Sequence, residues 1–176
     1  VAGAGADPAP FEGRWGVVEE ELEDAQREIS RTVRRVEPLL RGPRSRRGER
    51  LPSTLLQGLS LPRVDLVIED RGDAWELVTD GRDRRRVARR AVISRSTPIV
   101  RSGGGEDGDL IVETANDAGT RIIERYQRAS PDRLVLDLRL TNSLFDHPVE
   151  TRLSFLALPR DGAAPPPGNG NGDRPR

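Results

Sequence analysis

Residues 133–141 read RLVLDLRLT, and every second residue from Leu134 to Leu140 is a leucine. Successive side chains of a β-strand point to opposite faces, so this alternation predicts a strand with one buried face and one largely wetted face. Similar alternation recurs through residues 109–158, in four segments separated by short clusters of turn residues. We therefore expect an antiparallel β-meander in this part of the chain.

Strand signals also lie upstream of the meander, at residues 64–69, 75–79, 82–94 and 99–101. Asp80-Gly81 separates the second and third of these, and this pair favours a two-residue hairpin turn. About eight short strands with Gly, Asn, Asp and Pro between them indicate a mainly β sandwich or barrel.

The segment at about 18–41 has the pattern of an amphipathic helix. Its apolar residues recur at steps of three and four, with Glu early in the segment and Arg late. They are Val18, Leu22, Ala25, Ile29, Val33, Val36 and Leu40. We expect this stripe to dock on the domain's own sheet, because a helix of this length gains most of its stability from packing. If it stood free, the exposed stripe would drive association with another chain.

Length and composition limit the classes of protein. A chain of 176 residues fits one domain, which we place at 11–158, with disordered segments at 1–10 and 159–176. The 29 basic and 29 acidic residues balance, which removes the general electrostatic argument for nucleic-acid binding. There is no cysteine, one histidine and no long apolar run, so we expect no metal site, no cofactor and no transmembrane segment.

The first residues, VAGAGADP, resemble the small-residue stretch around a secretory cleavage site. They favour a periplasmic or extracellular protein. A trimmed fragment explains the same start equally well.

Phe11-Glu12-Gly13-Arg14-Trp15 contains a Gly-x-Trp at the head of the expected meander. This motif resembles the first-strand signature of lipocalins and other calycins. Together with the helix and residues 78–82 (VTDGR), it makes residues 11–158 similar to exported bacterial lipocalin-like proteins of unknown function. The resemblance implies an up-and-down barrel. In lipocalins, however, the helix follows the last long strand, and Thr79-Asp80-Gly81 stands where they have Thr-Asp-Tyr, so a curved half-barrel remains an equal alternative.

The resemblance also implies a structural plug, in which Gly13 and Trp15 close one end of the barrel. An arginine of a late strand, Arg139 or Arg152, would stack over the Trp15 ring as a cation–π cover. The alternative is that Trp15 is simply a core aromatic residue beside the helix.

A ligand site inside the barrel is the leading functional hypothesis. If Leu136 and Leu138 point inward, the more apolar face of the preceding strand carries Glu124 and Tyr126. Glu124 would then be the polar group of an apolar pocket. The candidate lining is Trp75, Leu77, Glu124, Tyr126, Leu136 and Leu138. We favour the alternative that Glu124 is solvated near an open rim or neutralised by a core arginine.

Three other features carry weaker functional signals. The arginine run at 82–90 lacks the interleaved aromatic residues of a nucleic-acid site, and we interpret it as a charged strand that prevents aggregation. The glycine-rich stretch 103–109 lacks the spacing of a calcium or phosphate loop, so we expect a hairpin connection. His147 lies in an expected loop, with no recognisable catalytic partner in sequence.

We therefore expect a non-catalytic, lipocalin-like protein that binds a small hydrophobic or amphipathic ligand between sheet and helix. The alternative is an envelope interaction or scaffold module with a filled core, which would use its helix or its arginine-rich strand. An interior void favours the first, and a packed interior the second. The sequence leaves the oligomeric state open.

Overall fold

The computed structural model describes residues 11–40, 54–89, 99–104 and 109–159. Within these ranges the chain forms nine strands, one α-helix and one short 3₁₀ turn. In chain order they are β1 (Gly13–Val17), α1 (Glu19–Leu40), η1 (Thr54–Leu56), β2 (Asp65–Asp70), β3 (Ala74–Thr79), β4 (Asp83–Ala88), β5 (Ile99–Gly104), β6 (Leu110–Asn116), β7 (Arg121–Ser130), β8 (Arg133–Thr141) and β9 (Val149–Ala157).

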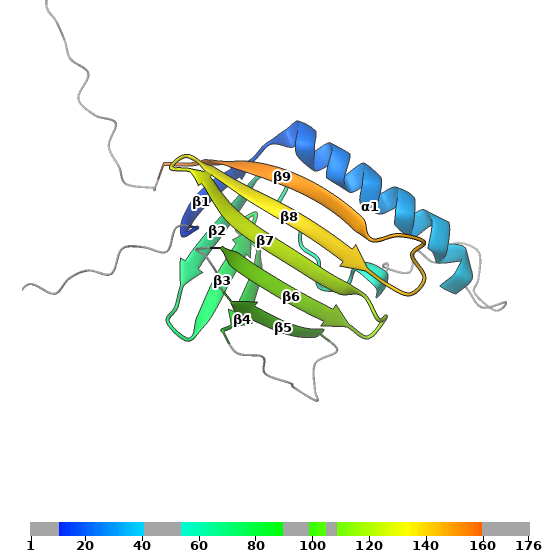
Figure 1. Ribbon diagram of the computed structural model, residues 1–176. Coiled ribbons are helices and arrows are strands. Elements are labelled where there is room, and N and C mark those ends of the chain that lie inside the picture. Colours follow the sequence, from blue (N-terminus) through cyan, green and yellow to red (C-terminus); the bar gives the residue numbers. More distant parts are fainter. Residues whose placement is uncertain (1–10, 41–53, 90–98, 105–108, 160–176) are drawn as a thin grey trace, which may run out of the picture.

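The nine strands form one antiparallel sheet in the order β4-β3-β2-β1-β9-β8-β7-β6-β5. Strands consecutive in sequence are neighbours in the sheet, except that β4 and β5 end it, and β1 joins β2 to β9. The sheet curves into a nearly closed barrel with the helix beside it (Figure 1). The predicted up-and-down architecture is therefore confirmed, with β1 added to the eight strands expected downstream of the helix.

The register of β7 against β8 confirms the predicted inner face. Glu124 lies opposite Leu138, and Tyr126 lies opposite Leu136. All four side chains are buried, as are Ile122 and Leu140 two residues further along. The alternate positions, such as Ile123 and Arg139, are partly or fully exposed.

Helix α1 begins one residue later than the sequence predicted and packs its apolar stripe on the barrel. Leu22, Ala25, Ile29, Val33 and Val36 are buried and belong to the same core as the strands. Strand β1 pairs with β9 over only three positions, Trp15 to Val17. The chain then turns into α1, which lies beside the rest of β9 (Figure 1). Docking of the helix on its own barrel is thus confirmed.

Some predictions fall outside the described residues, namely the disorder of 1–10 and of 160–176, and the end of the arginine-rich strand at 90–94. Strand β5 extends to Gly104, so the connection predicted from Gly103 begins later than expected. In the described ranges, no helix combines the length and the apolar character required to span a bilayer.

Candidate functional site

The six side chains predicted to line a ligand site share the inner surface of the barrel. Trp75 and Leu77 come from β3, Glu124 and Tyr126 from β7, and Leu136 and Leu138 from β8. None of the six is more than 3% exposed, and Leu77, Glu124 and Leu136 are at 0%. A side chain that bordered a ligand-sized space would keep exposed area on that side. These residues therefore pack against their neighbours.

Arg85 of β4 neutralises Glu124. Its Nη1 and Nη2 donate to the two carboxylate oxygens of Glu124 at 2.8 and 3.0 Å, in the bidentate geometry that suits this pair. The Tyr126 hydroxyl donates a third hydrogen bond to Glu124, at 2.7 Å. Arg85 is 3% exposed, so this is a buried ion pair. The favoured alternative for Glu124, neutralisation by a core arginine, is confirmed, and the solvated rim position is wrong.

The electrostatics of the triad favour a charged arginine and a protonated tyrosine. Burial alone would lower the pKa of Arg85, but the Glu124 carboxylate and the tyrosine beside it raise that pKa above its usual value. Burial, followed by the negative charge of Glu124, raises the pKa of Tyr126 well above its usual range. At neutral pH the Arg85 guanidinium is therefore charged and the Tyr126 hydroxyl keeps the proton that it donates to Glu124.

Four other polar atoms inside the barrel have no hydrogen-bond partner among the described residues. They are Trp75 Nε1, Thr79 Oγ1, Arg85 Nε and Thr114 Oγ1. A buried donor without an acceptor costs about 1–3 kcal/mol. The side chains inside the barrel are buried, but four of their polar atoms have no hydrogen-bond partner among the described residues.

Trp15 is buried at one end of the barrel, as the plug hypothesis requires. Its Nε1 donates to the carbonyl oxygen of Phe11 at 3.0 Å, four residues back. Gly13, at φ 149°, lies between them, in a backbone conformation that L side chains rarely adopt. The glycine of the Gly-x-Trp motif therefore allows the backbone to turn so that the Phe11 carbonyl oxygen reaches the Trp15 ring.

An arginine does stack over the Trp15 ring, but the prediction that it is Arg139 or Arg152 is wrong. The guanidinium over the ring belongs to Arg128 of β7, 5.8 Å from the ring centroid. Arg139 and Arg152 lie on the outer face of the barrel, where they pair with Glu150 and Asp137. Their alternation with the inward leucines excludes them from the interior.

Trp75 has its own cation–π contact. The Arg89 guanidinium lies 4.3 Å from the centroid of its ring, and the Phe11 ring meets it edge-on at 4.7 Å. Phe11 thus contacts Trp75 through its ring and Trp15 through its carbonyl oxygen. The two tryptophans and Phe11 fill one region of the core.

The arginine-rich strand β4 divides its charges between two faces. Arg84 and Arg86 are exposed and pair with Glu76 and Asp73, whereas Arg85 points inward. Arg89, just after the strand, pairs with Asp70. The interpretation of this run as a charged strand did not separate Arg85 from the exposed arginines. The sequence did contain a signal that Arg85 points inward. Val87 is the apolar β-branched residue of the strand, and it lies two residues from Arg85 and so on the same face.

The side chains of Asn116 and Asp80 hold loops in place through contacts that the sequence did not predict. Asn116 donates to the carbonyl oxygens of residues 54, 55 and 57 and accepts from the Thr120 amide, which ties η1 to the β6–β7 turn. Asp80 accepts from the backbone amides of residues 63, 64 and 65. Burial alone would raise the pKa of Asp80, but these three donors lower it below its usual value.

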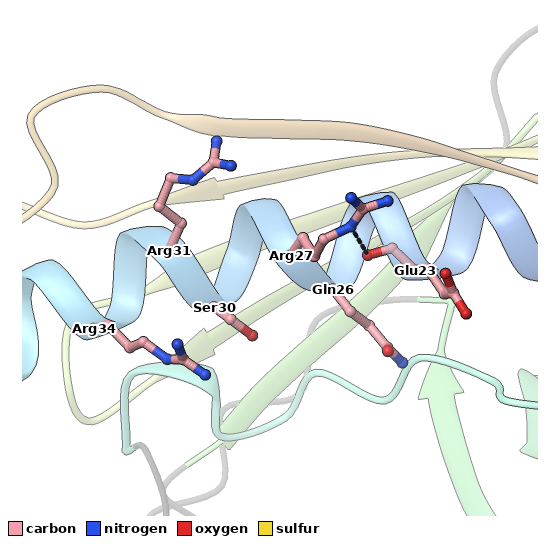
Figure 2. A pocket seen from close by; sticks show the side chains of 6 residues that line it. All are labelled: Glu23, Gln26, Arg27, Ser30, Arg31 and Arg34. Carbon is pink, nitrogen blue, oxygen red and sulfur yellow. Dashed lines mark hydrogen bonds between the residues drawn. The ribbon is translucent and has the colours of Figure 1, made fainter.

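The outer face of α1 carries a polar hollow of about 610 Å³, shown in Figure 2. Its lining among the described residues is Glu23, Gln26, Arg27, Ser30, Arg31 and Arg34. An apolar groove of about 220 Å³ adjoins it, sharing Gln26 and Ser30 and adding Leu56, Leu59 and Leu61. Arginines and leucines therefore lie next to one another along one side of the helix.

The described residues contain no cluster of three or more His, Asp or Glu side chains that would hold a metal ion. His147 lies exposed in the connection between β8 and β9.

Comparisons with known proteins do not assign a family. No family model and no curated protein matches the chain. Among solved structures, the chain is similar to a secretary abundant heat soluble (SAHS) protein from Ramazzottius varieornatus, at 13% identity and a TM-score of 0.48. The alignment covers 85% of this chain and 96% of that one. A likeness at this level carries no argument about function, which rests on the geometry described above.

Proposed function

We propose that this protein is a non-catalytic interaction module, in which a packed barrel presents the outer face of α1 to an acidic partner protein. The filled interior is the observation that carries this proposal. Leu77, Glu124 and Leu136 have no exposed area, and the charge of Glu124 is matched inside the barrel by Arg85. An interaction module needs no interior space, whereas a ligand carrier does.

The charge of α1 selects the kind of partner. Residues 27–35 contain four arginines and one glutamate. Arg27 and Arg31 pair with Asp24 and Glu28 on the helix itself, while Arg34 has no hydrogen bond or ion pair among the described residues. An acidic surface could pair with Arg34, which is unpaired among the described residues, and could replace the helix carboxylates at Arg27 and Arg31, which line the same hollow (Figure 2).

The leucines beside the helix add an apolar component to this surface. Leu56, Leu59 and Leu61 are partly buried and line the groove that adjoins the arginines. Arg84, Arg86 and Arg89 also pair with carboxylates of the same protein, but the leucine-lined groove adjoins the helix arginines and not these three. The helix, rather than the arginine-rich strand, is therefore the proposed contact.

Chemical cross-linking in the protein's own host tests the proposal. The helix variant is Arg27→Gln/Arg31→Gln/Arg34→Gln, and the matched control is Arg121→Gln/Arg139→Gln/Arg152→Gln on the outer face of the sheet. We expect one partner that is cross-linked to the wild type and the control but lost from the helix variant, and whose binding weakens with salt. Equal cross-linking by all three proteins would contradict the proposal.

A small-ligand carrier is the second candidate, favoured by one observation. Trp75 Nε1 and Arg85 Nε are buried donors without an acceptor among the described residues, and the buried hydroxyls of Thr79 and Thr114 also lack a partner there. A polar ligand group could satisfy them, provided that the packing rearranged to admit it. Export to the periplasm or beyond remains a prediction from the sequence.

A further inference from the structure

The barrel wall has one junction without a described backbone ladder. Eight neighbouring strand pairs are joined by hydrogen bonds, and the order begins at β4 and ends at β5. These two strands nevertheless lie against each other, because Gly103 of β5 lies against the Val87 side chain of β4. We call this junction the β4–β5 seam.

At Gly103, the β5 position whose surroundings the structure describes, close packing takes the place of backbone hydrogen bonds. A Cβ atom at Gly103 would lie 2.7 Å from Val87 Cγ1 and 3.4 Å from Trp75 Cδ1. A larger residue at position 103 would therefore overlap the Val87 side chain and force it to shift. Dispersion contacts of this kind are individually weak and are lost together when the surfaces separate.

The buried ion pair spans the same seam from inside. Arg85 lies on β4, two residues from Val87 and on the same face. Glu124 lies on β7, and the register connects it through Val112 of β6 to Gly103 of β5. Arg85 therefore reaches past β5 and β6 to join one end of the sheet to the third strand from the other end.

Separation of the seam would also hydrate groups that are now unsatisfied. Trp75 Nε1 and Arg85 Nε belong to residues of β3 and β4 on the seam side of the barrel, and neither has an acceptor in the part of the chain that the structure describes. Water reaching them would form the missing hydrogen bonds and offset part of the cost of exposing apolar surface. At the other junctions, opening must also break a backbone ladder.

We propose that the β4–β5 seam is a gate in the barrel wall, and that the bidentate Arg85–Glu124 pair is the latch that keeps it shut. The gate opens without unfolding the rest of the sheet and exposes the inner faces of β4 and β6. This goes beyond the proposed interaction function, which concerns the outer face of α1 and does not depend on it.

Thiol labelling of the folded protein tests the gate, since the chain has no native cysteine. Val87→Cys places a thiol at the seam, and Leu136→Cys places one in β8, which is paired on both sides; both side chains are at 0% exposure. We expect Val87→Cys to react at least tenfold faster, with a weaker dependence on urea, because its opening exposes less surface. If Val87→Cys does not fold, Val112→Cys on the inner face of β6 replaces it.

Loss of the latch gives the second arm. Glu124→Gln keeps the shape of the side chain but removes its charge, and Asp137→Asn does the same to an exposed pair with Arg152. We expect Glu124→Gln to accelerate labelling at the seam at least tenfold more than at Leu136→Cys, and Asp137→Asn to change neither. Equal labelling rates and equal urea slopes at the two thiols, with or without Glu124→Gln, would overturn the proposal.

Discussion

Removal of Arg85 tests the energetic role of the buried pair. Arg85→Met leaves the Glu124 carboxylate in the barrel with the Tyr126 hydroxyl as its remaining donor. Breaking a buried pair by deleting one partner costs about 3–5 kcal/mol, because an uncompensated charge stays buried. Against a total stability of about 5–15 kcal/mol for a typical domain, this is a large fraction. At about 3 °C per kcal/mol, the melting temperature should fall by about 9–15 °C.

The double variant Arg85→Met/Glu124→Leu separates the cost of an orphaned charge from the worth of the pair. Apolar residues of similar volume often replace a buried pair at little cost. The Tyr126 hydroxyl then loses its acceptor, which costs about 1–3 kcal/mol. We therefore expect the double variant to be more stable than Arg85→Met, although it carries one more substitution.

Urea unfolding followed by circular dichroism measures these stabilities. The control is Arg152→Met, which removes an exposed partner of Asp137 and should cost less than about 1 kcal/mol. A loss below about 1 kcal/mol for Arg85→Met would contradict this energetic role. So would a double variant whose loss equals the sum of the losses of Arg85→Met and Glu124→Leu measured singly.

Three further predictions concern sites that hold the barrel together. Gly103→Ala should destabilise the protein by about 1–3 kcal/mol in urea unfolding through overlap with Val87, and Val87→Ala in the same chain should recover part of the loss. Asn116→Ala should cost about 2 kcal/mol, measured in the same way, because the carbonyl oxygens of residues 54, 55 and 57 lose the Asn116 donor and the Thr120 amide loses its acceptor. Asp80 has a lowered pKa in the folded state, so its stabilising contribution is present above its unfolded pKa and is lost as the pH falls through its folded pKa. Asp80→Asn should therefore reduce the melting temperature at pH 7 and have little effect at the most acidic pH at which the wild type remains folded.

Local pattern predicted the elements and the inner faces well. The leucines at 134–140 identified the buried side of β8, and the more apolar parity of β7 placed Glu124 and Tyr126 beside them. The Asp80-Gly81 turn lies where the sequence placed it, with Asp80 at φ 53°. Each of these inferences depends on residues close together in the chain, where strand periodicity and turn chemistry apply directly.

Contacts between strands on opposite sides of the barrel could not be predicted from the local sequence pattern. Arg85 and Glu124 are 39 residues apart, and Asn116 bonds to carbonyl oxygens about 60 residues before it. Which residues meet across a barrel depends on strand number, register and closure, and none of these follows from the parity of one strand. Because register and closure are not visible in the sequence, it does not indicate that Arg128, and not Arg139 or Arg152, covers the Trp15 ring.

Side chains of the chain itself fill the barrel. Native mass spectrometry of the protein purified from its own host measures this most directly. We predict the mass of the bare polypeptide, with no small molecule retained under gentle ionisation. A stoichiometric adduct that is lost from the folded variant Tyr126→Phe, and kept by a surface control such as Arg152→Gln, would contradict the claim.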